Sequence, residues 1–490
     1  MKKFVLILLL AGITGFGAMT VWGSLRAKQE YRNLILAIAE SPDARILETS
    51  YERGWLLSKS RANVEIRGPL GGAFQRWLVG LGREEVRGRV GVRMRQTIEH
   101  GYAPFTDWLT GGLEGTPIIG RIETHFELDE ETQSEISAVL GRLPSVSIFT
   151  VIRVSGVGES SVIVPAQRLE SKLAGDEGGG WDAQWKGLRG NLVYTTDFEH
   201  LAASFHSPGI EGSRAGSLFA LGDLKWSADL TRDESGLLVG GVKVGVESFR
   251  LASGQEDVPV LELDDWAMRQ SNLVEAGSFE SALAIRVQAI RLGDRAFGPG
   301  TFEAELRNLD ARSLAQLQSR GVGGLAPPDS QNVTEPPVGG DGMGLLSDLV
   351  SRSPQLEIRT LRLATPSGVV EATLRIGLDG SRPGLLRDLF TLLLVLEVHA
   401  EFEFPVEILD ELYQDREEDL LELRREGWVL LDGERYRSRL DFEGGELFVN
   451  GLPKALGDLP GQPEVPQELP QVSAAPLGPE GVAPGPELLP

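Results

Sequence analysis

The chain has 490 residues, of which 41% are hydrophobic; it contains no cysteine and carries a formal net charge of −23 at pH 7. Residues 1–100 hold 16 Lys and Arg against 9 Asp and Glu, so the acidic surplus lies entirely in the remaining chain. The lack of cysteine excludes disulfides, thiol nucleophiles and Cys-ligated zinc. The acidic surplus argues against nucleic acid as a partner, because nucleic-acid binding needs a surface that neutralises phosphates.

The N-terminus begins with an apolar segment long enough to cross a bilayer. Residues 4–22 are uncharged and follow Lys2 and Lys3; as a helix they span roughly 28 Å. Bulky residues such as Met19 and Trp22 disfavour a signal-peptide cleavage site, although cleavage after Gly23 is the alternative. We therefore expect residues 1–3 to be a cytoplasmic stub, residues 4–22 a single transmembrane helix of the bacterial inner membrane, and the bulk of the chain periplasmic.

Apolar and polar residues alternate with a period of two in many stretches. In residues 86–98, Val90, Met94 and Ile98 fall on one side and arginines on the other, and the pattern returns in residues 122–128, 242–247, 302–306, 370–378 and 398–406. Such strands have one dry and one wet face, which is typical of antiparallel sheets. The pattern predicts a β-rich α+β fold, with one or two large curved antiparallel sheets and a few covering helices.

Helices and loops are predicted in fewer places. Residues 310–320, with Asp310 as N-cap, and the charged residues 408–425 favour helices, whereas the aliphatic residues 384–395 fit either a buried helix or a strand. A Gly- and Pro-rich linker or long loop, residues 321–344, separates a β-rich region, 23–320, from an α+β region, 345–456. Residues 457–490 are predicted to be a disordered acidic tail. Whether residues 23–456 form one domain or two stays open.

Catalytic and metal-binding signatures are absent from the sequence. It contains no Gly-x-Ser-x-Gly elbow, no His-Glu-x-x-His and no Walker loop. The five histidines are scattered, and each is expected to be a surface or turn residue: His100, His125, His200, His206 and His399. We therefore expect a protein that is not an enzyme and that needs no cofactor or metal.

Two clusters of aromatic residues and glycine indicate particular local structures. In the first, Tyr51, Arg53, Gly54 and Trp55, Gly54 would permit a tight turn with rings packed on either side. The second is a terminal β-meander that contains Tyr436 and ends at Asn450 and Gly451. Both are interpreted as structural motifs.

These clusters belong to an ordered set of motifs. An N-terminal anchor is followed by Arg53-Gly54-Trp55, His100-Gly101, Asn308-Leu309-Asp310, Ser353-Pro354 and the meander that ends in Val449-Asn450-Gly451. Over most of residues 1–456 this order resembles the YdgA-type family of bacterial envelope proteins, a domain of unknown function, although Tyr102 stands where that family would have Pro. The resemblance implies an inner-membrane-tethered periplasmic protein and brings no catalytic residues.

Three functions are weighed on this basis. The first is a non-enzymatic envelope protein that binds other envelope components, the second is lipid or amphiphile transfer along an apolar β-sheet groove, and the third is an enzyme. Four arginines of one strand face, Arg87, Arg89, Arg93 and Arg95, are candidate contacts for phospholipid headgroups or an acidic envelope protein. The alternative is that carboxylates such as Glu84, Glu85 and Glu99 neutralise them.

Overall fold

The computed structural model describes most of the chain between residues 44 and 455. The described ranges are 44–67, 89–100, 117–140, 143–170, 181–195, 198–214, 217–253, 259–319, 341–381, 389–412 and 417–455, with single residues or pairs within 24–39 and at 72, 106 and 110. The predicted anchor, residues 321–340 of the predicted linker and the predicted tail lie outside them. A search of the described residues for a helix long and apolar enough to span a membrane finds none.

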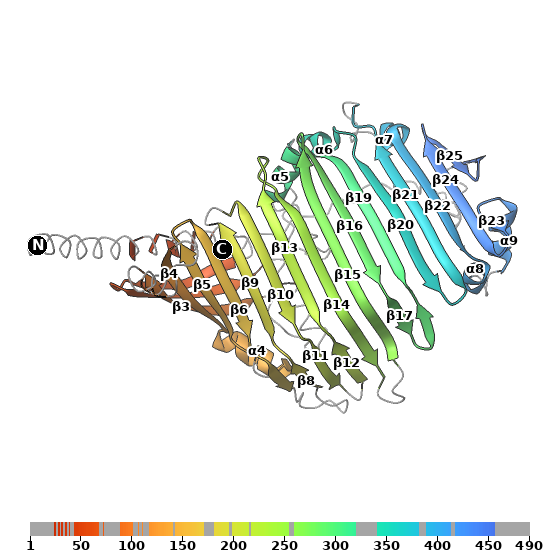
Figure 1. Ribbon diagram of the computed structural model, residues 1–490. Coiled ribbons are helices and arrows are strands. Elements are labelled where there is room, and N and C mark those ends of the chain that lie inside the picture. The colour runs from red at the N-terminus through yellow and green to blue at the C-terminus, as the bar shows by residue number, and fades with distance from the viewer. Residues whose placement is uncertain are drawn as a thin grey trace, which may run out of the picture.

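The described strands form one antiparallel sheet of 26 strands (Figure 1). The neighbouring strands of its main body are β1 Ala44–Glu52, β2 Leu57–Ile66, β3 Val90–His100, β4 Ile118–Leu128, β5 Val146–Arg153, β6 Val157–Val164, β9 Leu188–Thr195, β10 His200–Ser207, β13 Leu224–Arg232, β14 Leu238–Ala252, β15 Pro259–Glu275, β16 Ser278–Val287, β19 Gly300–Asp310, β20 Gln355–Thr365, β21 Gly368–Leu378, β22 Leu396–Pro405, β24 Arg435–Glu443, β25 Glu446–Val449 and β26 Leu452–Lys454. Shorter strands lie beside them: β7 Gln167–Glu170, β8 Trp181–Trp185, β11 Ile210–Arg214, β12 Ser217–Leu221, β17 Ala289–Leu292, β18 Arg295–Phe297 and β23 Leu430–Asp432. The predicted β-rich fold is confirmed.

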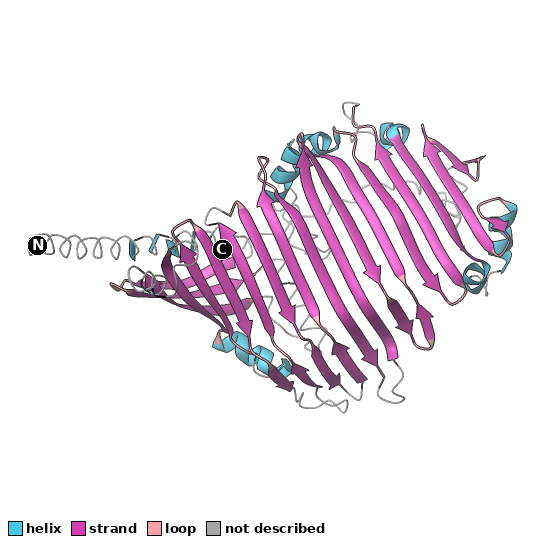
Figure 2. Cartoon of the chain, in the orientation of Figure 1, coloured by secondary structure: helices cyan, strands magenta, loops and turns pink. Residues whose placement is uncertain are grey.

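The described helices lie where strands end and do not form a layer across the sheet (Figure 2). They are α4 Glu130–Leu140, α5 Ala311–Ser319, α6 Asp341–Val350, α7 Leu389–Val395, α8 Val406–Leu412 and α9 Glu417–Arg425. The predicted cap of α5 is confirmed, because Oδ1 of Asp310 accepts a 2.9 Å hydrogen bond from the backbone N–H of Ser313.

Three predicted boundaries need correction. The stretch 408–425 contains two helices, α8 and α9, and the residues between them lie outside the description. The aliphatic stretch 384–395 ends in the helix α7, and β22 begins directly after it. The last four residues of the predicted linker, 341–344, start α6, because the Leu-rich residues that follow pack as an amphipathic helix.

The regions on the two sides of the predicted linker share the one sheet. β19 and β20 pair antiparallel, with Gly300 opposite Leu363 and Arg307 opposite Gln355. Residues 321–344 therefore connect two neighbouring strands.

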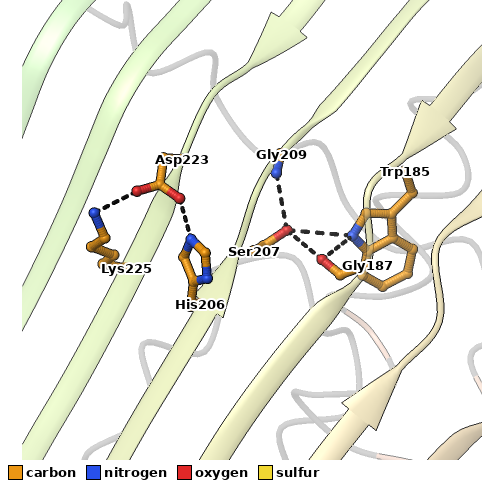
Figure 3. Close-up of polar contacts among 7 residues, drawn as sticks. All are labelled: Trp185, Gly187, His206, Ser207, Gly209, Asp223 and Lys225. Carbon is orange, nitrogen blue, oxygen red and sulfur yellow. Dashed lines mark hydrogen bonds and ion pairs between the residues drawn. The ribbon is translucent and has the colours of Figure 1, made fainter.

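Three pairs of consecutive strands are interrupted along one line of the sheet, which we call the crease. β8, β10 and β12 end there, and β9, β11 and β13 begin there. Figure 3 shows its hydrogen bonds: the Oγ of Ser207 donates to the Gly187 carbonyl at 2.8 Å, and the indole N–H of Trp185 donates to the same carbonyl at 3.1 Å. Gly209, with φ of 121°, allows a close approach, since a Cβ there would lie 2.1 Å from the Leu221 carbonyl oxygen. β12 and β13 both pair with β14, so the short strands extend the sheet beyond the crease.

The compact cores lie at the two ends of the sheet. One contains Tyr31, Ala62 and Met94, and the other contains Trp428, Phe442, Leu447 and Val449. Between them, the buried apolar residues on the described strands β9 to β21 are three alanines, Ala203, Ala228 and Ala252. The middle of the sheet therefore has no large buried core of its own in the described part of the chain.

Candidate functional site

One row of apolar side chains crosses the middle of the sheet. Each member stands directly opposite the next on the neighbouring strand: Phe205, Trp226, Val244, Met268, Ile285, Phe302, Leu361, Ala372 and Phe402. Residues paired across antiparallel strands share a face, so this row defines what we call the apolar face. A parallel row, from Ala203 to Leu440, is also apolar except for Gln270.

The positions one residue away have the opposite character. They form a row of mostly charged and small residues on what we call the charged face: His206, Lys225, Gly245, Ala267, Arg286, Thr301, Arg362, Glu371, Glu403 and Arg437. Successive side chains of a strand point to opposite faces. The sheet therefore separates apolar from charged residues over its whole middle part.

Side chains of the apolar row remain partly open to solvent. None of its nine members is fully buried, and Phe402 is 37% exposed. Phe205 and Trp226 have ring centroids 5.3 Å apart, and Phe205 lies over Gly190, where a Cβ would come 2.2 Å from the ring. No described helix or second sheet covers this row, so the rings and aliphatic chains pack mainly against each other.

The apolar row is long enough for an extended molecule. It runs over nine strands from β10 to β22, and eight strand spacings of about 4.8 Å give a length of roughly 38 Å. Acyl chains of membrane lipids fill about half of a hydrocarbon layer that is roughly 30 Å thick, so the row exceeds the length of one such chain.

The Arg53 cluster forms the turn between β1 and β2. The Nε of Arg53 donates a 2.7 Å hydrogen bond to the Oγ of Ser24, and a Cβ on Gly54 would lie 1.8 Å from the Leu57 carbonyl oxygen. The tight turn at Gly54 is thus confirmed. The predicted packing of rings on both sides is wrong for Trp55, which is 67% exposed. Tyr51 does pack, with its ring 5.2 Å from that of Tyr31.

His100 is buried, which corrects its prediction as a surface or turn residue. It is 2% exposed, and its Nε2 atom shares a 2.9 Å hydrogen bond with the Oγ of Ser58, which is also buried. Its Nδ1 atom has no hydrogen-bond partner in the part of the chain that is described. The described residues offer no group of three His, Cys, Asp or Glu arranged to hold a metal ion.

Three of the four predicted arginines lie on β3 or next to it, beside acidic residues. Arg89 lies 3.8 Å from Glu131, Arg93 lies 3.8 Å from Glu130, and Arg95 pairs with Glu127. Arg87 lies outside the described residues. These acidic neighbours come from β4 and α4, whereas Glu84 and Glu85, which were considered from the sequence, lie outside the described residues. All three arginines keep at least 37% of the side chain exposed, so they can still reach a charged surface.

The terminal meander closes the far end of the sheet as predicted. Tyr436 is 1% exposed, and its hydroxyl lies 3.4 Å from Oδ1 of Asp410. Asn450, with φ of 51°, donates from its side chain to the Gly427 carbonyl at 2.7 Å and accepts from the Arg439 N–H at 2.9 Å. Gly451, with φ of 79°, completes the turn into β26. These residues hold backbone together and present no site.

Comparison with known protein families gives a match over most of the chain. The model of a family described as "Bacterial protein of unknown function (DUF945)" matches residues 1–456. No curated protein and no solved structure matches the chain.

Proposed function

Because the chain belongs to a bacterial protein family of unknown function, we propose its role from its own surfaces. It is a non-enzymatic, membrane-anchored envelope protein that binds a lipid or another amphiphile along the apolar face of its sheet. In this role, the envelope component that binds to the sheet is the lipid itself.

The observation that carries this proposal is the partly exposed apolar row from Phe205 to Phe402. A protein that binds only through loops would cover the dry face of its sheet with its own helices, because exposed apolar area is unfavourable in water. Burying one methylene is worth about 0.8 kcal/mol, so ten methylenes laid along the row would contribute about 8 kcal/mol before ordering costs. An acyl chain can follow the row without any polar group on its path.

The membrane location is supported by the near end of the sheet. Residues 4–22 have the length of a bilayer span, and Ser24 follows them by two residues. Arg53 lies in the turn between β1 and β2 and donates a hydrogen bond to Ser24. At the same turn, the side chains of Trp55, Leu56 and Leu57 are 67%, 43% and 40% exposed. Tryptophan is enriched at membrane interfaces. This arrangement, with the YdgA-type resemblance, favours a sheet that starts at the inner-membrane surface and extends into the periplasm.

The test compares substitutions on the two faces of the same strands. The double variant Ile285→Asn/Leu361→Asn places amides in the apolar row, and the matched control Ala282→Asn/Thr360→Asn places them on the charged face of the same two strands. Full-length protein is extracted in a nonionic detergent, and co-purifying phospholipid is measured by native mass spectrometry. Circular dichroism confirms that each variant is folded.

We expect lipid on the wild type and on the control, and at least a several-fold loss on the apolar-face variant. Equal lipid on both folded variants would contradict the proposal, as would a wild type that carries none. A stoichiometric protein in place of lipid would favour a scaffolding role.

A further inference from the structure

The charged face contains a basic hollow beside the crease. Its volume is about 920 Å³, and strands from β6 to β16 line it. Five cationic side chains contribute to the lining: Arg189, Lys225, Lys243, Arg269 and Arg286. None of the described residues that line it is acidic. We call this site the basic hollow.

The register of the strands explains why the hollow is there. Gly245 and Ala267 stand side by side between Lys225 on β13 and Arg286 on β16, in one row across four strands. Because glycine and alanine are small, they leave a low floor between two long cationic side chains. Three strand spacings of about 4.8 Å put the backbones of these two residues roughly 14 Å apart.

The adjacent row brings two like charges together. Lys243 on β14 stands directly opposite Arg269 on β15, and both side chains are exposed. Like charges in directly opposed positions destabilise a sheet. In the described part of the chain neither residue has an ion-pair partner, so the repulsion is not offset within the protein. An anion bound between them would offset it.

Carboxylates at the margin hold two of the other cations. The Nζ of Lys225 lies 2.5 Å from Oδ2 of Asp223, which also pairs with His206 (Figure 3). Arg286 lies 3.8 Å from Glu303. Asp223 and Glu303 flank the hollow without lining it. They fix the positions of the outer cations and leave Lys243, Arg269 and Arg189 available.

The charge of the hollow opposes that of the protein around it. The whole chain carries −23, and residues 101–490 carry all of the acidic excess. A concave cationic surface concentrates field lines and attracts anions even when the total charge is negative. Lysine and arginine on several sides suit a ligand with more than one negative oxygen, and phosphate oxygens accept such charge-assisted hydrogen bonds well.

We propose that the basic hollow binds a ligand that bears a negatively charged phosphate group. Its source is either the headgroup of an anionic lipid or a free polyphosphate, and both present the same chemistry to Lys243 and Arg269. The inference is independent of lipid on the apolar face, because the two sites lie on opposite sides of the same strands.

The test removes the opposed pair in the full-length chain, purified in a nonionic detergent. The variant is Lys243→Gln/Arg269→Gln. The matched control Arg45→Gln/Lys59→Gln removes two exposed cations from β1 and β2, far from the hollow. Two probes are titrated by calorimetry: inorganic tripolyphosphate, and dioctanoyl phosphatidylglycerol below its micellar concentration. The melting temperature of each protein is also measured with and without tripolyphosphate.

We expect at least one probe to bind the wild type and the control equally and the variant about tenfold more weakly, as the loss of charge-assisted hydrogen bonds predicts. The ligand-free variant should melt no lower than the wild type, since a like-charge pair has been removed. If the variant weakens the binding of tripolyphosphate alone, the ligand is a free polyanion. If the variant weakens the binding of the lipid, the ligand is a lipid headgroup. If neither probe binds the wild type, or the variant binds both as the wild type does, the proposal is overturned.

The design separates this inference from the proposed function. Loss of lipid from Ile285→Asn/Leu361→Asn with unchanged tripolyphosphate binding would show that the two faces act independently. If the lipid assay contradicts the proposed function, the tripolyphosphate titration still tests the basic hollow. If the titration contradicts the basic hollow, the lipid assay still tests the apolar face.

Discussion

Ser58 and His100 are joined by a 2.9 Å hydrogen bond between Oγ and Nε2, and both side chains are buried. Burial lowers the pKa of His100, and the nearby charge of Arg53 lowers it further. The imidazole is therefore neutral at pH 7. The bond links β2 to the end of β3, next to the turn that carries Trp55.

The buried imidazole makes the stability of the protein depend on pH. Because the pKa of His100 is lower in the folded protein than its ordinary value of 6.5, the unfolded chain takes up the proton first. The contribution of the neutral His100 side chain to the free energy of unfolding is complete above pH 6.5 and is lost as the pH falls below that value. We predict that the free energy of unfolding, measured with urea between pH 7.5 and 5.0, falls less steeply for His100→Gln than for the wild type. Equal slopes would assign the pH dependence to other groups.

The N-terminal segment should stay attached to the chain. Bulky residues such as Met19 and Trp22 disfavour a signal-peptide cleavage site, and Ser24, just beyond residues 4–22, is fully buried and accepts a hydrogen bond from Arg53. We predict that mass spectrometry of the mature protein finds Met1 and that the protein stays in the membrane fraction in high salt. A mature chain that starts at Ser24 and appears in the soluble periplasmic fraction would identify a signal peptide instead.

The terminal meander should be required for folding, and the tail should not. Truncation before Gly427 removes Trp428 and Phe442 of the far core together with the buried Tyr436, whereas truncation after Pro460 removes none of these residues. We predict that limited proteolysis is unchanged by the tail truncation and much faster after the longer one. Equal proteolysis rates would show that the meander contributes no stability to the rest of the sheet.

The four arginines of residues 87–95 should contribute to the attraction of an anionic membrane. Replacing Arg87, Arg89, Arg93 and Arg95 by Gln removes no apolar side chain, so the variant should fold. We predict weaker, salt-dependent binding of the full chain to phosphatidylglycerol liposomes. The acidic neighbours of Arg89, Arg93 and Arg95 limit the effect to a few-fold, because partly paired surface charges contribute little. Unchanged liposome binding in a folded variant would leave these arginines as intramolecular ion-pair partners.

Strands with a regular alternation of apolar and polar residues could be predicted from the sequence because alternation is a local property. The dry sides of β3 and β14 are visible in Met94 and Ile98, and in Val242 and Val244, without knowledge of any neighbour. The cap at Asp310 is local in the same way. The boundaries of α6 to α9 could not be predicted as well, because Leu-rich stretches fit both the period of a helix and the period of a strand.

The candidate sites depend on pairing between strands and could not be read from single stretches. Phe205 and Phe402 belong to one row only because eight successive registers align them. The alternation of residues 242–247 marks Lys243 as a polar position, but only the pairing of β14 with β15 places Arg269 opposite it. Two basic residues on the wet sides of consecutive strands are the signal that could have pointed to the hollow. The burial of His100 likewise depends on Ser58, which is 42 residues away in the sequence.

The far edge of the sheet limits its growth. β26 has only three residues, and its central residue, Pro453, has no backbone N–H to donate. A strand from a second molecule would find too few hydrogen-bonding groups there to add to the ladder. A chain that can stack many strands in succession thus ends in an edge that disfavours the addition of a second copy through β26.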